Sequence, residues 1–176
     1  SIFRLLQLPL NALREDLVKP LVRGCEKRED PSVRRYKHGA TGGQTRALAQ
    51  FLREHGLRNL ADSFVITRHF AMRYRSETLN LHWSSERCQI ELTSPTAVTI
   101  WTTRKTSLNQ RVPICRNCIC VKQCPALCAV CLIHRRAKRC KTGHLFSSLD
   151  YPTALYHLKE AAARLGWPEP SEWGLH

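Results

Sequence analysis

The chain has 176 residues, with 28 lysines and arginines against 14 acidic residues, for a formal net charge of +14 at pH 7. This length fits one ordinary domain with an extension, or two small domains. No apolar run reaches the length of a membrane span, and no secretory signal pattern is present. The charge favours nucleic acid as the partner over an anionic lipid surface.

The first part of the chain, residues 1–44, is predicted to be an N-terminal extension and linker that precedes a domain at 45–176. The stretch "PLNALREDLVKPLVRG" predicts a short helix, with Asn11 as its N-cap and Pro20 disturbing its end. The next twenty residues are expected to be irregular, since Gly39, Gly42 and Gly43 supply flexibility there.

Helical periodicity begins at Thr45, where Leu48, Phe51 and Leu52 share one face, and Gly56 is expected to end this helix. The following segment, residues 59–83, is predicted to continue as helix. Its core candidates are Leu60, Phe64, Ile66, Phe70, Leu79 and Leu81.

The period then changes to alternation in "CQIELTSPTAVTIWTTRKTS", which predicts two or three short strands with a turn at Ser94 and Pro95. A cysteine-rich insertion at about 112–144 is expected to interrupt this small sheet. A last helix is predicted to begin at Asp150 and Pro152 and to end at Gly166. The residues expected to share one of its faces are Leu155, Leu158, Ala162 and Leu165. The predicted fold class is α+β, mainly helical with a small antiparallel sheet.

Six cysteines lie within the eighteen residues "ICRNCICVKQCPALCAVC". Clustering, basic composition and the absence of a secretory signal disfavour a disulfide scaffold. Four thiolates in two closely spaced pairs are typical of a structural Zn²⁺ site, which fixes a loop without doing chemistry. An iron–sulfur cluster would use the same ligands and is the alternative cofactor.

Two pairings fit the spacing. They share Cys118, Cys128 and Cys131, and the fourth ligand is either Cys115 or Cys120. Further candidate ligands are Cys124, Cys140 and His144, and the last two could complete a second site.

No aspartate or glutamate occurs between Glu91 and Asp150, and the cysteines lie inside this cationic span. We expect the cations here, together with two earlier arginines, to contact phosphates. The predicted nucleic-acid-binding residues are Arg73, Arg75, Arg104, Lys105, Arg111, Arg116, Lys122, Arg135, Arg136, Lys138, Arg139 and Lys141.

Four stretches, in order, resemble the catalytic domain of tyrosine recombinases, including DIRS-like enzymes of eukaryotic mobile elements. "FAMRYRSETLNLHW" resembles the first active-site box, and "TIWTTRKTS" the hairpin that bears a catalytic lysine. "CICVKQCPALCAVC" resembles a cysteine-rich insertion after that hairpin. The residues from Leu145 to His176 resemble the helix and lead-in to the His-x-x-Arg box.

The resemblance implies roles for a few residues. The first-box arginine would be Arg73, with Arg75 as the alternative because one extra residue precedes Ser76 and Glu77. The hairpin lysine would be Lys105, beside Arg104, and His176 would open the last box. The sequence given stops before the second arginine and the nucleophilic tyrosine, so an inactive site is expected, with no cleavage by tyrosine attack.

The predicted function is therefore that of a non-catalytic, zinc-stabilised nucleic-acid-binding protein on a recombinase-derived scaffold. The expected home is a large ribonucleoprotein such as a mitochondrial ribosome, with rRNA favoured over DNA and with neighbouring protein partners. The missing initiator methionine and basic first residues favour the mitochondrion, with the nucleus as alternative. Two other hypotheses are a fragment of a DNA-cleaving recombinase and a zinc-bound protein–protein adaptor.

Overall fold

The computed structural model describes residues 40–84, 87–103, 110–118, 120, 127–139 and 141–175. The helix predicted near Asn11 lies outside these ranges. Six of the predicted site residues do so too: Arg104, Lys105, Lys122, Cys124, Cys140 and His176. The described part combines helices with one three-stranded antiparallel sheet, so the α+β class is confirmed.

The first described helix, α3, spans Gly42–Glu54 and begins three residues earlier than predicted. A capping box explains the early start: Thr41 Oγ1 accepts from the Gln44 N–H, and Gln44 Oε1 accepts from the Thr41 N–H. The apolar face buries Leu48 and Leu52.

The second helix, α4, spans Arg58–His69, and the prediction that it continues to Trp83 is wrong. The chain reverses at Ala71, which has a φ of 50°, and Arg73 is extended. A single π-helical turn, η2, follows at Tyr74–Thr78. The reversal returns Tyr74 to α4, where its buried hydroxyl bonds Ser63 Oγ at 2.8 Å and its ring meets Phe64.

The sheet contains β1 (Cys88–Ser94), β2 (Ala97–Thr103) and β3 (Arg111–Asn117), in that order. The turn predicted at Ser94 and Pro95 is confirmed, because Ser94 pairs with Ala97. One face buries Ile90, Ile100 and Ile114. The cysteine-rich segment does not interrupt the sheet: residues 112–117 of the expected insertion belong to β3, which pairs along its length with β2.

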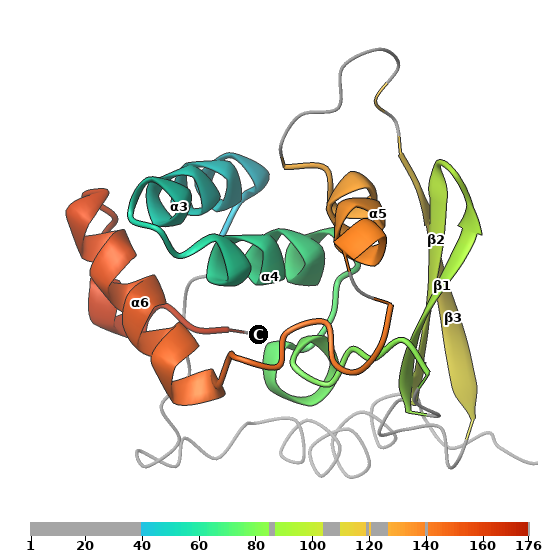
Figure 1. The fold of residues 1–176 in the computed structure, drawn as a ribbon. Helices are drawn as coiled ribbons and strands as arrows, with labels where there is room; N and C mark the ends of the chain where they lie inside the picture. The colour runs from blue at the N-terminus through green and yellow to red at the C-terminus, as the bar shows by residue number, and fades with distance from the viewer. Residues whose placement is uncertain are drawn as a thin grey trace, which may run out of the picture. The chain divides into compact units, whose positions relative to one another are not determined.

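Helix α5, Ala129–Arg139, lies within the predicted cysteine-rich insertion, for which the sequence predicts a metal site and no helix. Its apolar side chains Val130, Leu132 and Ile133 are buried. In Figure 1 this helix lies between α4 and the sheet, and it contacts both α4 and β2. It therefore completes the core and joins the helical part of the chain to the sheet.

The predicted last helix is present as α6, Tyr151–Arg164, with Asp150 as N-cap accepting from the Thr153 N–H at 2.9 Å. Leu158 and Ala162 are buried as expected, while Leu155 and Leu165 are only partly buried. A short 3₁₀ turn, η3 (Pro170–Glu172), follows. Among the described helices, none has the length and apolar character to cross a membrane.

Candidate metal centre and cationic surface

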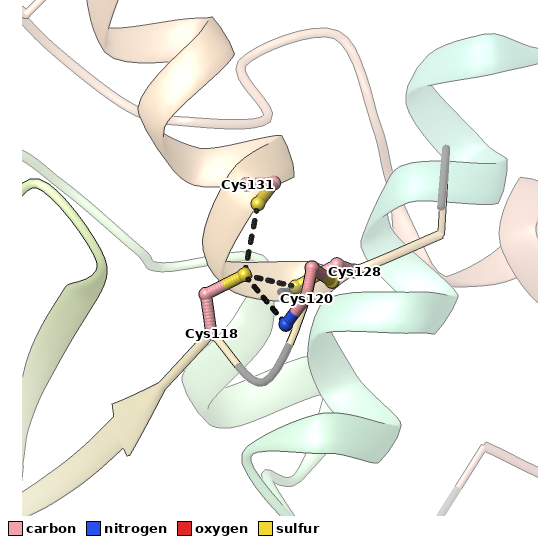
Figure 2. A group of neighbouring side chains, drawn as sticks. All are labelled: Cys118, Cys120, Cys128 and Cys131. Carbon is pink, nitrogen blue, oxygen red and sulfur yellow. Dashed lines mark hydrogen bonds between the residues drawn. The ribbon is translucent and has the colours of Figure 1, made fainter. Parts of the chain in front are cut away.

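Four cysteines converge where β3 ends and α5 begins. The sulfur atoms of Cys118, Cys120, Cys128 and Cys131 all lie within 4.8 Å of one another. Figure 2 shows Cys118 just beyond the arrowhead of β3 and Cys131 on the first turn of α5. Two pairs of cysteines that are eight to thirteen positions apart in sequence are thus brought to one point.

The sulfur separations fit a metal ion and not a disulfide. Cys118 Sγ lies 3.3 Å from Cys131 Sγ and 3.7 Å from Cys128 Sγ. A disulfide requires about 2.05 Å, and none of the described cysteines forms one. Four sulfurs at about 2.3 Å from a central tetrahedral ion would stand roughly 3.8 Å apart. The four thiols can therefore hold a metal ion.

Local hydrogen bonding favours the thiolate form of Cys118. The backbone N–H of Cys120 donates to Cys118 Sγ at 3.4 Å, and the Cys131 thiol is a further partner. Together they lower the pKa of Cys118 to about 7. Because a metal binds the thiolate and not the thiol, this arrangement reduces the cost of deprotonation on binding.

Of the two pairings open from the sequence, the structure forms the one that uses Cys120. Cys115 lies on β3 with an exposed side chain, where it accepts a hydrogen bond from Thr99 Oγ1 at 3.5 Å. His144 also lies outside the group, and its ring meets that of His82 at 4.8 Å. Cys115 lies within β3, whereas Cys118 follows the end of the strand, where the chain turns toward α5.

The predicted phosphate-contacting residues are spread over several elements. Arg75 lies over the Tyr151 ring, and Arg111 over the Trp101 ring. Arg116 donates to the carbonyl of His69 at 3.4 Å, which helps to lower the pKa of that imidazole, after the larger effect of burial. These three guanidinium groups are on exposed residues and remain available to a partner.

The cations of α5 form the densest group. Arg135, Lys138 and Arg139 are exposed, whereas Arg136 is partly buried and paired with Asp62 at 3.0 Å. Arg136 therefore has a structural role, which sequence analysis did not anticipate.

A cavity of about 740 Å³ beside α5 includes residues outside the predicted nucleic-acid-binding set. Its lining includes Arg53, Arg58 and Trp83 together with Arg135, Arg136 and Arg139 of α5. The first three precede the acid-free span by at least eight residues, and only folding brings them to it. Their residue types are a usable signal, because arginine binds phosphate and tryptophan can stack on a base, but the sequence does not show that the three residues meet.

A smaller cavity, of about 320 Å³, lies on another part of the chain. It is lined by Arg73 from the segment before η2 and by Trp173, Gly174 and Leu175, which lead to His176. Arg75, the alternative first-box arginine, is not part of this lining.

No protein-family model, curated protein or solved structure matches the chain.

Proposed function

We propose that this chain is a nucleic-acid-binding protein in which a Zn²⁺ ion, held by Cys118, Cys120, Cys128 and Cys131, fixes a cationic helix. One observation carries the proposal: the thiols lie at the start of α5, and the same helix presents Arg135, Lys138 and Arg139 to solvent. The metal and the cations thus act on one element of eleven residues.

The chemistry of α5 supports a polyanionic partner. The helix carries four cations and no acidic residue, and three of the cations lie in its last turn. Cations that are held close together at fixed positions release counterions from a phosphate backbone when they bind it. Fixing the helix in advance also reduces the ordering cost that binding would otherwise incur.

Zinc fits the four-thiolate set best, because a closed tetrahedron of cysteines is typical of structural Zn²⁺. An iron–sulfur cluster uses the same ligands and is the alternative. Metal analysis separates the two, since a cluster would bring iron, sulfide and visible absorption.

Nucleic-acid binding is tested with matched RNA and DNA oligonucleotides, single- and double-stranded, over a range of salt concentrations. We expect the triple variant Arg135→Ala, Lys138→Ala, Arg139→Ala to lose at least about tenfold in affinity. The slope of log K against log salt should fall by roughly 2–3, about one for each phosphate contact removed.

The matched control removes three cations elsewhere: Arg46→Ala on α3, with Lys159→Ala and Arg164→Ala on α6. It should change affinity far less. Equal losses in both triple variants would mean that net charge alone drives binding, and no binding by the parent protein would refute the function. Preference for RNA and co-sedimentation with ribosomal particles would support the ribonucleoprotein role predicted from the sequence.

A second candidate function, DNA cleavage of the tyrosine-recombinase type, is supported by the smaller cavity. The resemblance assigns a catalytic arginine to Arg73 and a catalytic residue to His176, and Arg73 shares this cavity with the three residues that precede His176. The π turn also accommodates one more residue than an α turn, which suits the extra residue between Arg73 and Ser76.

This candidate is tested by incubating the protein, in the longest form present in the cell, with nicked suicide DNA substrates. A covalent protein–DNA adduct that Arg73→Ala reduces by at least about 100-fold would support it. Arg75→Ala tests the alternative assignment: because Arg75 lies outside this cavity, its loss should reduce adduct formation far less than loss of Arg73. Absence of any adduct in the parent protein would contradict the recombinase function and leave the nucleic-acid-binding proposal standing.

A further inference from the structure

The large cavity beside α5 is built by five segments of the chain. Arg53 comes from the end of α3, Arg58 from the start of α4, and Arg139 from α5, while residues 142–145 and Trp83 close another side. The volume of about 740 Å³ lies within the range of about 300–1,000 Å³ that is usual for ligand sites.

Its inner arginines are fixed by one carboxylate. Asp62 accepts from Arg53 at 2.6 Å and from Arg136 at 3.0 Å, and its side chain is only 14 % exposed. Arg136 also donates to Asn59 Oδ1 at 2.8 Å and lies over the Phe146 ring. This network joins α3, α4 and α5, so the cavity has a stiff cationic frame.

Two donors of this network are unsatisfied. The Nε atoms of Arg53 and Arg136 are buried, yet neither has an acceptor among the described residues. A buried donor without an acceptor costs free energy. Because both Nε atoms are buried, ligand contacts in the cavity would fall to other guanidinium atoms and to the cations at the rim.

The rim adds free cations. Arg58 and Arg139 are exposed, and neither forms an ion pair within the described ranges. Arg58 also lies at the start of α4, whose N-cap, Leu57, provides no side-chain hydrogen bond. The first amides of a helix and the helix dipole favour an anion. The Arg58 cation is unfavourable at this position unless an anion lies between the guanidinium group and those amides.

An apolar wall completes the lining. Trp83, Leu132 and Leu145 all line the cavity, and the Trp83 backbone is held by its N–H donating to the carbonyl of Gly143 at 3.1 Å. The indole is half-buried. A flat aromatic wall next to arginines is the usual setting in which an unpaired base stacks while its phosphate is bound.

From this combination we infer that the cavity is a nucleotide pocket, which takes one unpaired nucleotide of a bound strand with its base against Trp83 and its phosphate near Arg58. The inference rests on the proposed function and adds a location and a strand type to it. Extended single strands or looped-out nucleotides should bind, and blunt duplexes should not use this pocket.

The test measures affinity and tryptophan quenching with an eight-nucleotide single strand and with the same strand carrying abasic sites. We expect Arg58→Ala to lose about tenfold in affinity for both strands, with a salt slope smaller by roughly 0.7. Trp83→Leu should lose about tenfold for the strand with bases and almost nothing for the abasic strand, because stacking alone is removed.

Arg46→Ala, on the exposed face of α3, is the charge-matched control and should change affinity less than about twofold. Circular dichroism must show that each variant is folded. If Trp83→Leu proves unfolded, Trp83→Phe replaces it in the test. Because phenylalanine can still stack on a base, this variant should keep its affinity and show reduced quenching.

The outcomes separate the nucleotide-pocket inference from the proposed nucleic-acid-binding function. If the parent protein binds and the α5 triple variant does not, but Arg58→Ala and Trp83→Leu bind normally, the nucleotide pocket is wrong and the function stands. If the parent binds no strand, both fail. Equal competition by polyglutamate would show that the cavity is a general acceptor of acidic chains, which also overturns the inference.

Discussion

Replacing Cys131 by serine is expected to abolish metal binding and to unfold the start of α5. The parent protein should contain about one Zn²⁺ per chain, and the variant close to none. Loss of a residue that only hydrogen-bonds to a metal ligand costs about 10–100-fold in metal affinity, and loss of the ligand itself should cost more. Because metal binding and folding are coupled in small thiolate sites, helical content should fall together with metal content. Metal analysis and circular dichroism measure the two effects.

Cys115→Ser is the matched control, because Cys115 is exposed and lies outside the four-thiol group. It should leave metal content unchanged. Alkylation followed by peptide mapping gives an independent check: the metal should protect Cys118, Cys120, Cys128 and Cys131, while Cys115 reacts. Cys88 should react slowly with or without metal, since burial raises the pKa of its thiol. Full metal content in Cys131→Ser protein would refute the ligand set.

Replacing Asp62 by alanine is expected to lower the free energy of unfolding by about 2–3 kcal/mol. The side chain bonds two guanidinium groups that are themselves only 22 % and 20 % exposed, and both would lose their acidic partner. Removing one partner of a fully buried pair costs about 3–5 kcal/mol, and partial exposure here reduces the cost. In a chain of this size the melting temperature should drop by roughly 5–10 °C.

Glu54→Ala is the control for Asp62→Ala. Glu54 lines the same cavity and carries the same charge, but it is exposed and accepts only from Gln50 within the described part of the chain. It should change the stability by less than about 0.5 kcal/mol. Equal effects of the two substitutions on thermal unfolding would mean that Asp62 does not connect the three helices.

The two expected effects concern one region of the molecule. A metal bound by the four thiols would fix the start of α5, and Asp62 holds the middle of the helix through Arg136. The exposed cations lie between and beyond these two points. Loss of either anchor should therefore also weaken the proposed nucleic-acid binding, although none of the proposed phosphate-contacting residues has been changed.

Local sequence determined much of the secondary structure. Capping and periodicity were enough to predict α6, because Asp150 and Pro152 are start signals whose physics involves only neighbouring residues. Alternation and the turn at Ser94 predicted the hairpin of β1 and β2 for the same reason. Helix α5 was missed, since its four basic residues and two flanking cysteines obscured a buried stripe of Val130, Leu132 and Ile133.

The same division holds for the functional features. Composition by itself determined that the chain is strongly basic, and cysteine spacing determined that a thiolate site is possible. Tertiary structure alone decided that Cys120 and not Cys115 completes the four-thiol group, because the strand carries Cys115 away from the others. It also decided that Arg53, Arg58 and Trp83 meet α5 around one cavity. Such contacts join residues up to about eighty positions apart, and they depend on how helices pack, which short-range sequence patterns do not encode.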